Sequence, residues 1–150
     1  MRASFSLNNV SKLYLLNLTT DRPNDIPIFR QNLSRLFPHV VVEVNLAQFL
    51  ALEIVQQNPL VVLVAHGNSK SSNLYATRNA ALPVSTRDEI VSKLEAITAT
   101  GNSAGVRACI CSGNVLEGST STDIVDYVAY TFKLVTADLF INAIEKELSP

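Results

Sequence analysis

Two runs of strand length each end in a chemically reactive side chain that is followed by a small residue. The first run, Leu-Val-Val-Leu-Val-Ala over 60–65, precedes His66 and Gly67. The second, Val-Arg-Ala-Cys-Ile-Cys over 106–111, ends in Cys111 and is followed by Ser-Gly. Mainly apolar runs of this length are typical of strands buried in a parallel sheet, whose carboxyl ends face the binding crevice of an α/β protein. The two runs therefore predict a histidine and a thiol on neighbouring strand ends.

Strand and helix patterns alternate along the rest of the chain, which favours a mostly parallel sheet with helices on both of its faces. Strand patterns cover 12–18, 40–44 and 125–132, and helical spacing of apolar residues covers 28–37, 46–55, 90–97 and 139–148. The sequence therefore predicts a single domain over 1–150, with a polar leader at 1–11 and a three-layer α/β/α architecture.

Local signals set the boundaries of these elements. Pro38 ends the first helix, Ser85 reads as the N-cap of the third, and Thr136 reads as the N-cap of the last. The segment 74–82 is expected to form a short hairpin or an extended piece at the carboxyl edge of the sheet. The loop before 125–132 is short for a parallel crossover, so either it contains a helical turn or that run begins a helix instead.

The composition restricts the class of protein and its partners. With 47% hydrophobic and 17% charged residues among 150, the chain has the make-up of a folded domain large enough to bury its own core. A net charge of −1 without a cluster of lysines and arginines argues against nucleic acid as a partner. No apolar run approaches the ~18 residues of a membrane span, and the amino terminus lacks the apolar stretch of a secretory signal. A cytoplasmic protein that does not bind membranes is therefore expected.

The segments 61–67 and 106–111 resemble the two catalytic blocks of caspase-like cysteine peptidases, the group of caspases, metacaspases, clostripain-type peptidases and bacterial CHAT domains. In that group one hydrophobic block ends in His-Gly and a later one ends in the nucleophilic cysteine. The 45-residue separation of His66 and Cys111 is close to the ~50 residues typical of caspases. The resemblance implies a caspase-like fold and a dyad in which His66 is the base. It also implies an oxyanion hole made by the backbone N–H groups of Gly67 and Cys111.

Two cysteines compete for the role of nucleophile, because the sequence Ala-Cys-Ile-Cys-Ser-Gly over 108–113 departs from the family patterns. Alignment on Cys-x-Gly selects Cys111, whereas alignment on Ala-Cys selects Cys109. Cys111 is favoured because it lies where the strand ends, while Cys109 lies two residues deeper on the same side and is expected to pack. The Cβ atoms of such a pair lie roughly 6 to 7 Å apart, too far for a disulfide. No metal or other cofactor is expected, since further ligands would have to be assembled by chance.

The loop after the first strand carries charges of both signs, on Asp21, Arg22 and Asp25. Caspases bind an aspartate of the substrate with an arginine from this loop, and metacaspases use acidic residues in similar places, so the resemblance implies that these three residues bind substrate. Cys109 occupies the position at which those families place glutamine or aspartate. A small neutral side chain there argues against a strongly charged S1 pocket. The substrate residue recognised at P1 stays open.

Three functions are compatible with these observations. The first is a small CHAT-type cysteine endopeptidase that cleaves a protein or peptide with His66 and Cys111. The resemblance implies that it acts in a larger bacterial assembly, with a separate regulatory chain or a second copy of itself as partner. The second is a catalytically silent protein-interaction module on the same fold, in which the thiol is buried. The third and least favoured is a flavodoxin-like binder of small molecules, because the turn after Leu18 lacks a glycine-rich phosphate cradle.

Overall fold

The structure is a computed structural model that describes residues 4–68, 71–111, 118–119, 122–132 and 137–148. The main strands are β1 (Lys12–Asn17), β2 (Val41–Val44), β3 (Pro59–Ala65), β6 (Ala104–Cys111), β7 (Gly118–Ser119) and β8 (Val125–Phe132), and the short β4 (Asn73–Leu74) and β5 (Ser85–Thr86) lie between β3 and β6 in the chain. The helices are α1 (Ile26–Leu36), α2 (Leu46–Leu50), α3 (Arg87–Ala96) and α4 (Ala137–Glu147), and a 3-10 turn, η1, covers Leu7–Asn9. Within the described ranges, no helix is long and apolar enough to cross a membrane.

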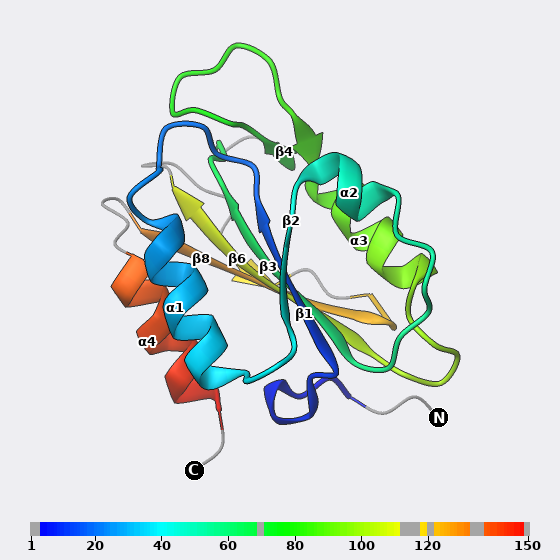
Figure 1. Cartoon of the computed structure of the whole chain (residues 1–150). Coiled ribbons are helices and arrows are strands. Elements are labelled where there is room, and N and C mark those ends of the chain that lie inside the picture. The colour runs from blue at the N-terminus through cyan, green and yellow to red at the C-terminus, as the bar shows by residue number, and fades with distance from the viewer. Residues whose placement is uncertain (1–3, 69–70, 112–117, 120–121, 133–136, 149–150) are drawn as a thin grey trace.

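The main sheet has the strand order β2-β1-β3-β6-β8-β7 and lies between two layers of helices (Figure 1). Its first five strands are parallel, and β7 pairs antiparallel with β8 at the edge. The β4–β5 pair lies beyond the carboxyl ends of the parallel strands. The run 125–132 is therefore a strand, and the predicted three-layer α/β/α fold with a mostly parallel sheet is confirmed.

Each face of the sheet carries its own hydrophobic core, because successive side chains of a strand point to opposite faces. The core beneath α1 and α4 is built on the strands from Leu13, Leu15, Leu60, Val62, Val64, Cys109 and Cys111. We call it the α1/α4 core. Its helices meet through the rings of Phe29 and Phe140, whose centroids are 5.5 Å apart. The opposite core, beneath α2 and α3, is built on the strands from Tyr14, Leu16, Val61, Leu63, Ala65, Val106, Ala108 and Ile110.

The second helix is shorter than predicted. Helical spacing favoured a helix over 46–55, but α2 ends at Leu50. The chain then turns away because Gln56 joins the end of the α3 segment: its N–H donates to the carbonyl of Ile97 at 2.8 Å, and its carbonyl accepts from the N–H of Ala99 at 2.7 Å. The prediction was wrong in this half of the helix because tertiary hydrogen bonds outweighed local periodicity.

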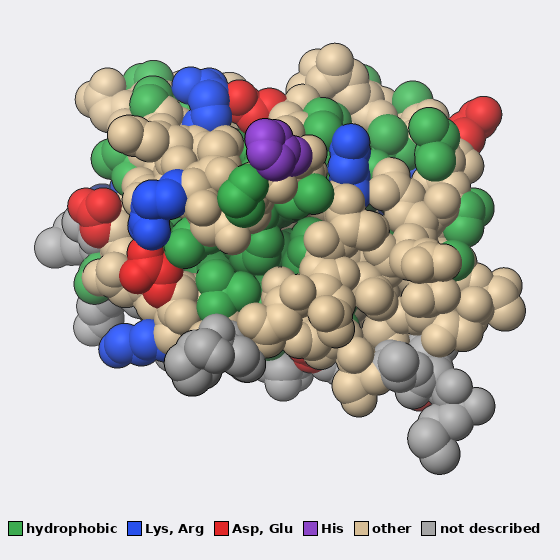
Figure 2. All heavy atoms as spheres, turned by 60° about the horizontal axis from the view of Figure 1, so that its bottom comes forward, with side chains coloured by type: hydrophobic (Ala, Val, Ile, Leu, Met, Phe, Trp, Pro, Cys, Tyr) green, Lys and Arg blue, Asp and Glu red, His purple; other side chains and the backbone are tan. Residues whose placement is uncertain are grey.

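Because α2 is short, one part of the sheet face that it covers remains open. A groove of ≈ 590 Å³ lies there between β1, β2 and the extended segment 52–57. Beside it Ile54 and Val55 are 72% and 58% exposed. On the face that Figure 2 brings forward, hydrophobic side chains gather around a hollow near the centre, and basic and acidic side chains are interspersed around them.

The third helix begins one residue later than predicted. Its N-cap is Thr86, whose hydroxyl accepts the N–H of Glu89 at 3.1 Å. Ser85 belongs to β5 instead, and its hydroxyl donates to the Glu89 carboxylate at 2.6 Å. The hairpin expected over 74–82 is present at its base as the β4–β5 pair. The predicted cap Thr136 lies outside the described residues.

Two apolar side chains of the predicted polar leader pack against the amino-terminal end of the sheet. Leu7 is buried in the α1/α4 core. The ring of Phe5 lies against Gly105, where a Cβ atom would come within 2.3 Å of the ring. The guanidinium of Arg107 lies 5.3 Å from the centre of the same ring. The leader is therefore part of the packed domain.

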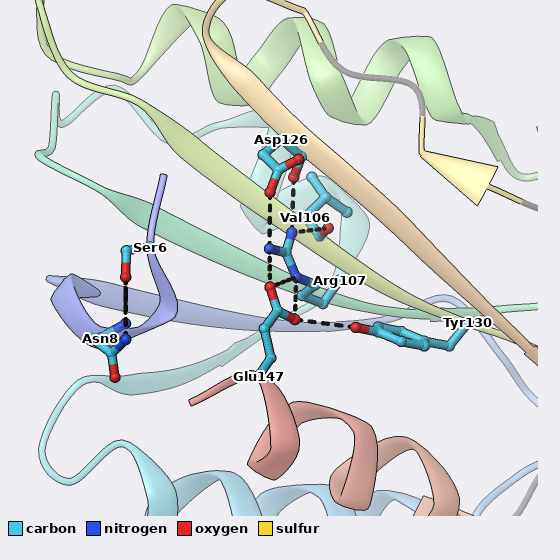
Figure 3. A network of polar contacts seen from close by, with 7 residues as sticks. All are labelled: Ser6, Asn8, Val106, Arg107, Asp126, Tyr130 and Glu147. Atoms are coloured by element: carbon cyan, nitrogen blue, oxygen red, sulfur yellow. Dashed lines mark hydrogen bonds and ion pairs between the residues drawn. The ribbon is translucent and has the colours of Figure 1, made fainter. Parts of the chain in front are cut away.

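A buried charge cluster fastens α4 to the middle of the sheet (Figure 3). Arg107 is only 2% exposed, and it donates to the carboxylate of Glu147 at the end of α4 and to that of Asp126 on β8. Its Nη1 also donates to the carbonyls of Val106 and Asp126, both at 3.0 Å. The hydroxyl of Tyr130 donates to Glu147 at 3.1 Å. We call Arg107, Asp126, Tyr130 and Glu147 the Arg107 cluster.

Candidate functional site

His66 and Cys111 end up side by side at the carboxyl ends of two adjacent parallel strands. β3 and β6 pair in a register that runs to Val64 opposite Cys109 and Ala65 opposite Ile110. The next position places His66 beside Cys111, and the Nδ1 atom of the ring lies 2.5 Å from the carbonyl oxygen of Cys111. Since Val64 and Cys111 both belong to the α1/α4 core, alternation places the histidine on that face as well.

The imidazole of His66 is held from both of its nitrogens. Its Nε2 lies 2.7 Å from Oδ1 of Asp21, and the side chain is almost fully buried. Both neighbours, the carboxylate and the carbonyl of Cys111, only accept hydrogen bonds. A ring with both nitrogens protonated satisfies the two contacts at once, whereas a neutral ring donates to only one of them. Among the described residues, neither nitrogen is hydrogen-bonded to the Cys111 thiol.

Asp21 links the histidine to the segment that follows β4. Partial desolvation alone would raise the pKa of its carboxyl, but the hydrogen bond and the charge of His66, together with the N–H of Arg78, lower that pKa overall. The N–H of Arg78 donates to the second carboxylate oxygen at 3.4 Å. The backbone of His66 itself pairs with that of Tyr75 in both directions, at 2.9 and 2.8 Å. The loop after β1, the end of β3 and the segment 75–78 therefore meet around one imidazole.

The two thiols share the α1/α4 core and influence each other. Cys109 is fully buried, and Cys111, expected to be accessible at the strand end, is only 5% exposed. The pKa of Cys111 is lowered, first by a hydrogen bond from Cys109 and then, against the effect of burial, by the positive charge of Arg22. The pKa of Cys109 is raised by the same interaction and by burial. Cys111 is therefore the thiol that ionises first, as a nucleophile must.

The charged residues of the loop after β1 have different partners. Arg22 and Asp25 form an ion pair with Nε 2.6 Å from the carboxylate, and the field of the arginine reaches the thiols. The same loop, 21–25, lines an open cavity of ≈ 260 Å³. This volume lies just below the range of about 300 to 1,000 Å³ that is typical of small-molecule sites. Asp21, for which a substrate contact was predicted, is engaged with His66.

Gly67 follows His66 at a tight place in the structure. It is buried, and a Cβ atom there would lie 2.9 Å from Cγ2 of Ile110. Among the backbone hydrogen bonds of the described residues, none is made by its N–H. Cys111 is paired with Phe132 in the β6–β8 register. The oxyanion roles of the two residues remain predictions.

No three side chains of His, Cys, Asp or Glu type converge as metal ligands would, within the ranges that the structure describes.

Sequence reasoning assigned Asp21 to substrate binding and did not foresee its contact with His66. The two residues are far apart in the chain, and the only available signal was that each follows a predicted strand of the same parallel sheet. The role of Arg107 was also missed. A charged residue inside an otherwise apolar run was the signal, because a buried guanidinium requires carboxylate partners.

Comparisons with protein-family models, with curated proteins and with solved structures found no significant match to this chain. The fold is therefore the only observation that can be compared with the family resemblance of the two motifs. The mostly parallel sheet, with a histidine and a cysteine at the ends of adjacent strands, is compatible with a caspase-like fold.

Proposed function

We propose that this chain is a caspase-like cysteine endopeptidase that uses Cys111 as nucleophile and His66 as general acid and base. The observation that carries the proposal is that the two residues end adjacent parallel strands in register, on one face of the sheet. The lowered pKa of Cys111 supports the same choice of nucleophile over Cys109. The substrate is a protein or peptide segment, as the resemblance to caspase-like peptidases implies.

The chemistry follows from these positions. The Cys111 thiolate attacks the carbonyl carbon of the scissile peptide bond, and the oxygen of the tetrahedral intermediate is stabilised by backbone N–H groups, with Gly67 as the first donor. The carbon–nitrogen bond then breaks as the imidazolium of His66 protonates the leaving amine. A water molecule, deprotonated by the neutral imidazole, adds to the thioester, and the carbon–sulfur bond breaks to release the carboxylic acid and the thiolate.

Covalent labelling with peptidyl chloromethyl ketones tests this proposal without knowledge of the natural substrate. A panel with different P1 side chains should alkylate Cys111 in the native chain, as read by intact mass and peptide mapping. The substitution Cys111→Ala should abolish the adduct, and His66→Ala should slow it by about 100-fold or more. His39→Ala is the matched control, because the only other histidine is exposed and lies in the α1–β2 connection. Cys109→Ala should also leave Cys111 as the labelled residue.

A second candidate function, a non-catalytic protein-interaction module, is favoured by one observation, the burial of both thiols. In that case a small reagent should modify Cys109 and Cys111 at similar slow rates. The substitution His66→Ala would then leave both rates unchanged. Selective labelling of Cys111 that depends on His66 rejects the module, and equal labelling rejects the peptidase.

A further inference from the structure

We propose that Asp21 is a positioning residue of this site, which holds His66 with its Nδ1 edge toward the end of β6 and stabilises the charged ring during proton transfer. This inference rests on the proposed function. It turns the expected dyad into an Asp21–His66–Cys111 arrangement, and it removes Asp21 from the set of residues expected to contact substrate.

The geometry around the ring supports this role. The contact between Nε2 of His66 and Oδ1 of Asp21 is 2.7 Å, within the range of a charge-assisted hydrogen bond. It leaves Nδ1 as the ring nitrogen that faces Cys111, since this atom lies against the carbonyl of that residue. A carboxylate that binds one imidazole nitrogen fixes both the orientation and the proton position of the ring. The other nitrogen then lies at the backbone of Cys111, the residue that carries the reacting thiol.

The segment that leads from β1 to Asp21 is held in place by hydrogen bonds. At the end of β1, Oδ1 of Asn17 accepts from the N–H and the hydroxyl of Thr19, at 2.9 and 2.6 Å. The N–H of Thr20 donates to the carbonyl of Ala76 at 3.0 Å. Asp21 therefore reaches His66 from a backbone that is anchored on its β1 side, as a positioning residue requires.

Asp21 acts on the Cys111 thiol in two opposite ways, and this makes its role measurable. As a nearby negative charge, its carboxylate raises the pKa of Cys111. Acting through His66, it holds the ring in the orientation and proton position in which a charged imidazole stabilises the thiolate. Removing the charge therefore speeds alkylation of Cys111 if only the direct effect operates, and slows it if Asp21 acts through the histidine. The other ionisable groups that act on this thiol are Arg22, Asp25 and Cys109.

The experiment measures the rate of alkylation of Cys111 by iodoacetamide between pH 5 and 9. The substitution Asp21→Asn keeps the size of the side chain and an oxygen that accepts from Nε2, and removes the charge. We expect it to slow alkylation at pH 7 about three- to tenfold and to move the midpoint of the pH profile upward, since one pKa unit is tenfold in thiolate. In the His66→Ala background the same substitution should not slow the reaction. Asp21→Glu, which restores a carboxylate, should recover part of the rate.

Asp25→Asn is the matched control. Asp25 belongs to the same loop and also raises the pKa of Cys111 by its charge, but its carboxylate pairs with Arg22. We therefore expect this substitution not to slow alkylation in either background. An Asp21→Asn variant that reacts at the wild-type rate or faster overturns the inference, and so does equal slowing in the presence and absence of His66. If His66→Ala alone has no effect on Cys111, the proposed function fails, and this inference fails with it.

Discussion

The middle and the carboxyl end of β6 carry buried polar groups on the same face of the sheet, and these groups are satisfied in different ways. In the middle of the strand, each nitrogen of the Arg107 guanidinium has an acceptor, and two carboxylates balance its charge. At the carboxyl end, His66 lies between two acceptors, and the two thiols shift each other's pKa in opposite directions. A fully paired charge holds elements together, whereas an incompletely matched group is available for chemistry. The same strand thus carries the Arg107 cluster, which holds elements together, and Cys111, which belongs to the candidate site. We call the carboxyl end of β6 the reactive end.

The largest expected effect on stability comes from disrupting the Arg107 cluster. The substitution Arg107→Met keeps most of the side-chain volume but removes the cation that pairs with Asp126 and Glu147 and the donor to two backbone carbonyls. We expect the free energy of unfolding to fall by about 3 kcal/mol, as measured by urea denaturation. Alkylation of Cys111 in the folded state should stay within about twofold of the wild type, because the reactive end is four residues away along the strand.

Arg30→Ala is the control for this comparison. Arg30 also pairs with a carboxylate, that of Glu43, but both side chains are about half exposed. The free energy of unfolding should therefore stay close to that of the wild type, because solvent screens an exposed ion pair. If the two arginine substitutions lower the free energy of unfolding equally, the burial of Arg107 does not determine its contribution to stability. The contrast drawn between the Arg107 cluster and the reactive end of β6 is then wrong.

The next effect concerns the hydrogen bond between the thiols at the reactive end. Cys109→Ala removes the donor that lowers the pKa of Cys111, so that pKa should rise. Alkylation of Cys111 at pH 7 should become about five- to tenfold slower, because thiolate is the reacting form. Cys109→Ser keeps an O–H donor and should retain most of the rate. A faster reaction in the alanine variant would show that Cys109 shields Cys111 rather than activating it.

The contacts of Phe5 with Gly105 and Arg107 should contribute a smaller amount to the free energy of unfolding. Phe5→Ala removes a ring that packs on Gly105 and faces the Arg107 guanidinium. We expect a loss of about 1 kcal/mol in the free energy of unfolding. In the Arg107→Met background the loss should be smaller, because the cation–π part of the interaction is already gone. Equal losses in both backgrounds would assign the whole effect to packing on the glycine.

The smallest effect is the pH dependence that Asp21 adds to stability. Its pKa is lower in the folded chain than the usual 3.8, so it stabilises the fold above about pH 4, and this contribution is lost as the pH falls through the folded pKa. The side chain is 36% exposed, so solvent screening should keep the difference between wild type and Asp21→Asn well below about 1 kcal/mol. Urea denaturation at pH 6 and pH 2.5 measures it. In the His66→Ala background, the difference between the two pH values should shrink.

The fold was predictable wherever burial decides the structure. The run 60–65 is a strand because its side chains fill both cores, and 125–130 because its apolar side chains pack against the same cores. The segment 51–55 was not predictable from periodicity, because Ile54 and Val55 are exposed and its course is set by the hydrogen bonds of Gln56. The N-cap of α3 was misplaced by one residue, since Ser85 and Thr86 are both good caps and only β5 pairing distinguishes them.

The sequence allowed prediction of those parts of the candidate site that lie at strand ends, and not of those that lie in loops. The neighbouring positions of His66 and Cys111 follow from the rule that parallel strands present their carboxyl ends at one edge. The contact of Asp21 with His66 depends on how a loop folds over that edge, and periodicity carries no information about loop geometry. The near-complete burial of Cys111 depends on tertiary packing in the same way. The catalytic role of these residues remains a prediction.

The Arg107 cluster also has a consequence for the order in which the chain folds. Arg107 is synthesised 19 residues before Asp126 and 40 residues before Glu147, so β6 emerges with an unpaired cation in its centre. Burial of that strand before α4 arrives would leave the charge without a partner in an apolar layer. We therefore expect the centre of the sheet and the last turn of α4 to acquire protection from hydrogen exchange together, as one cooperative unit.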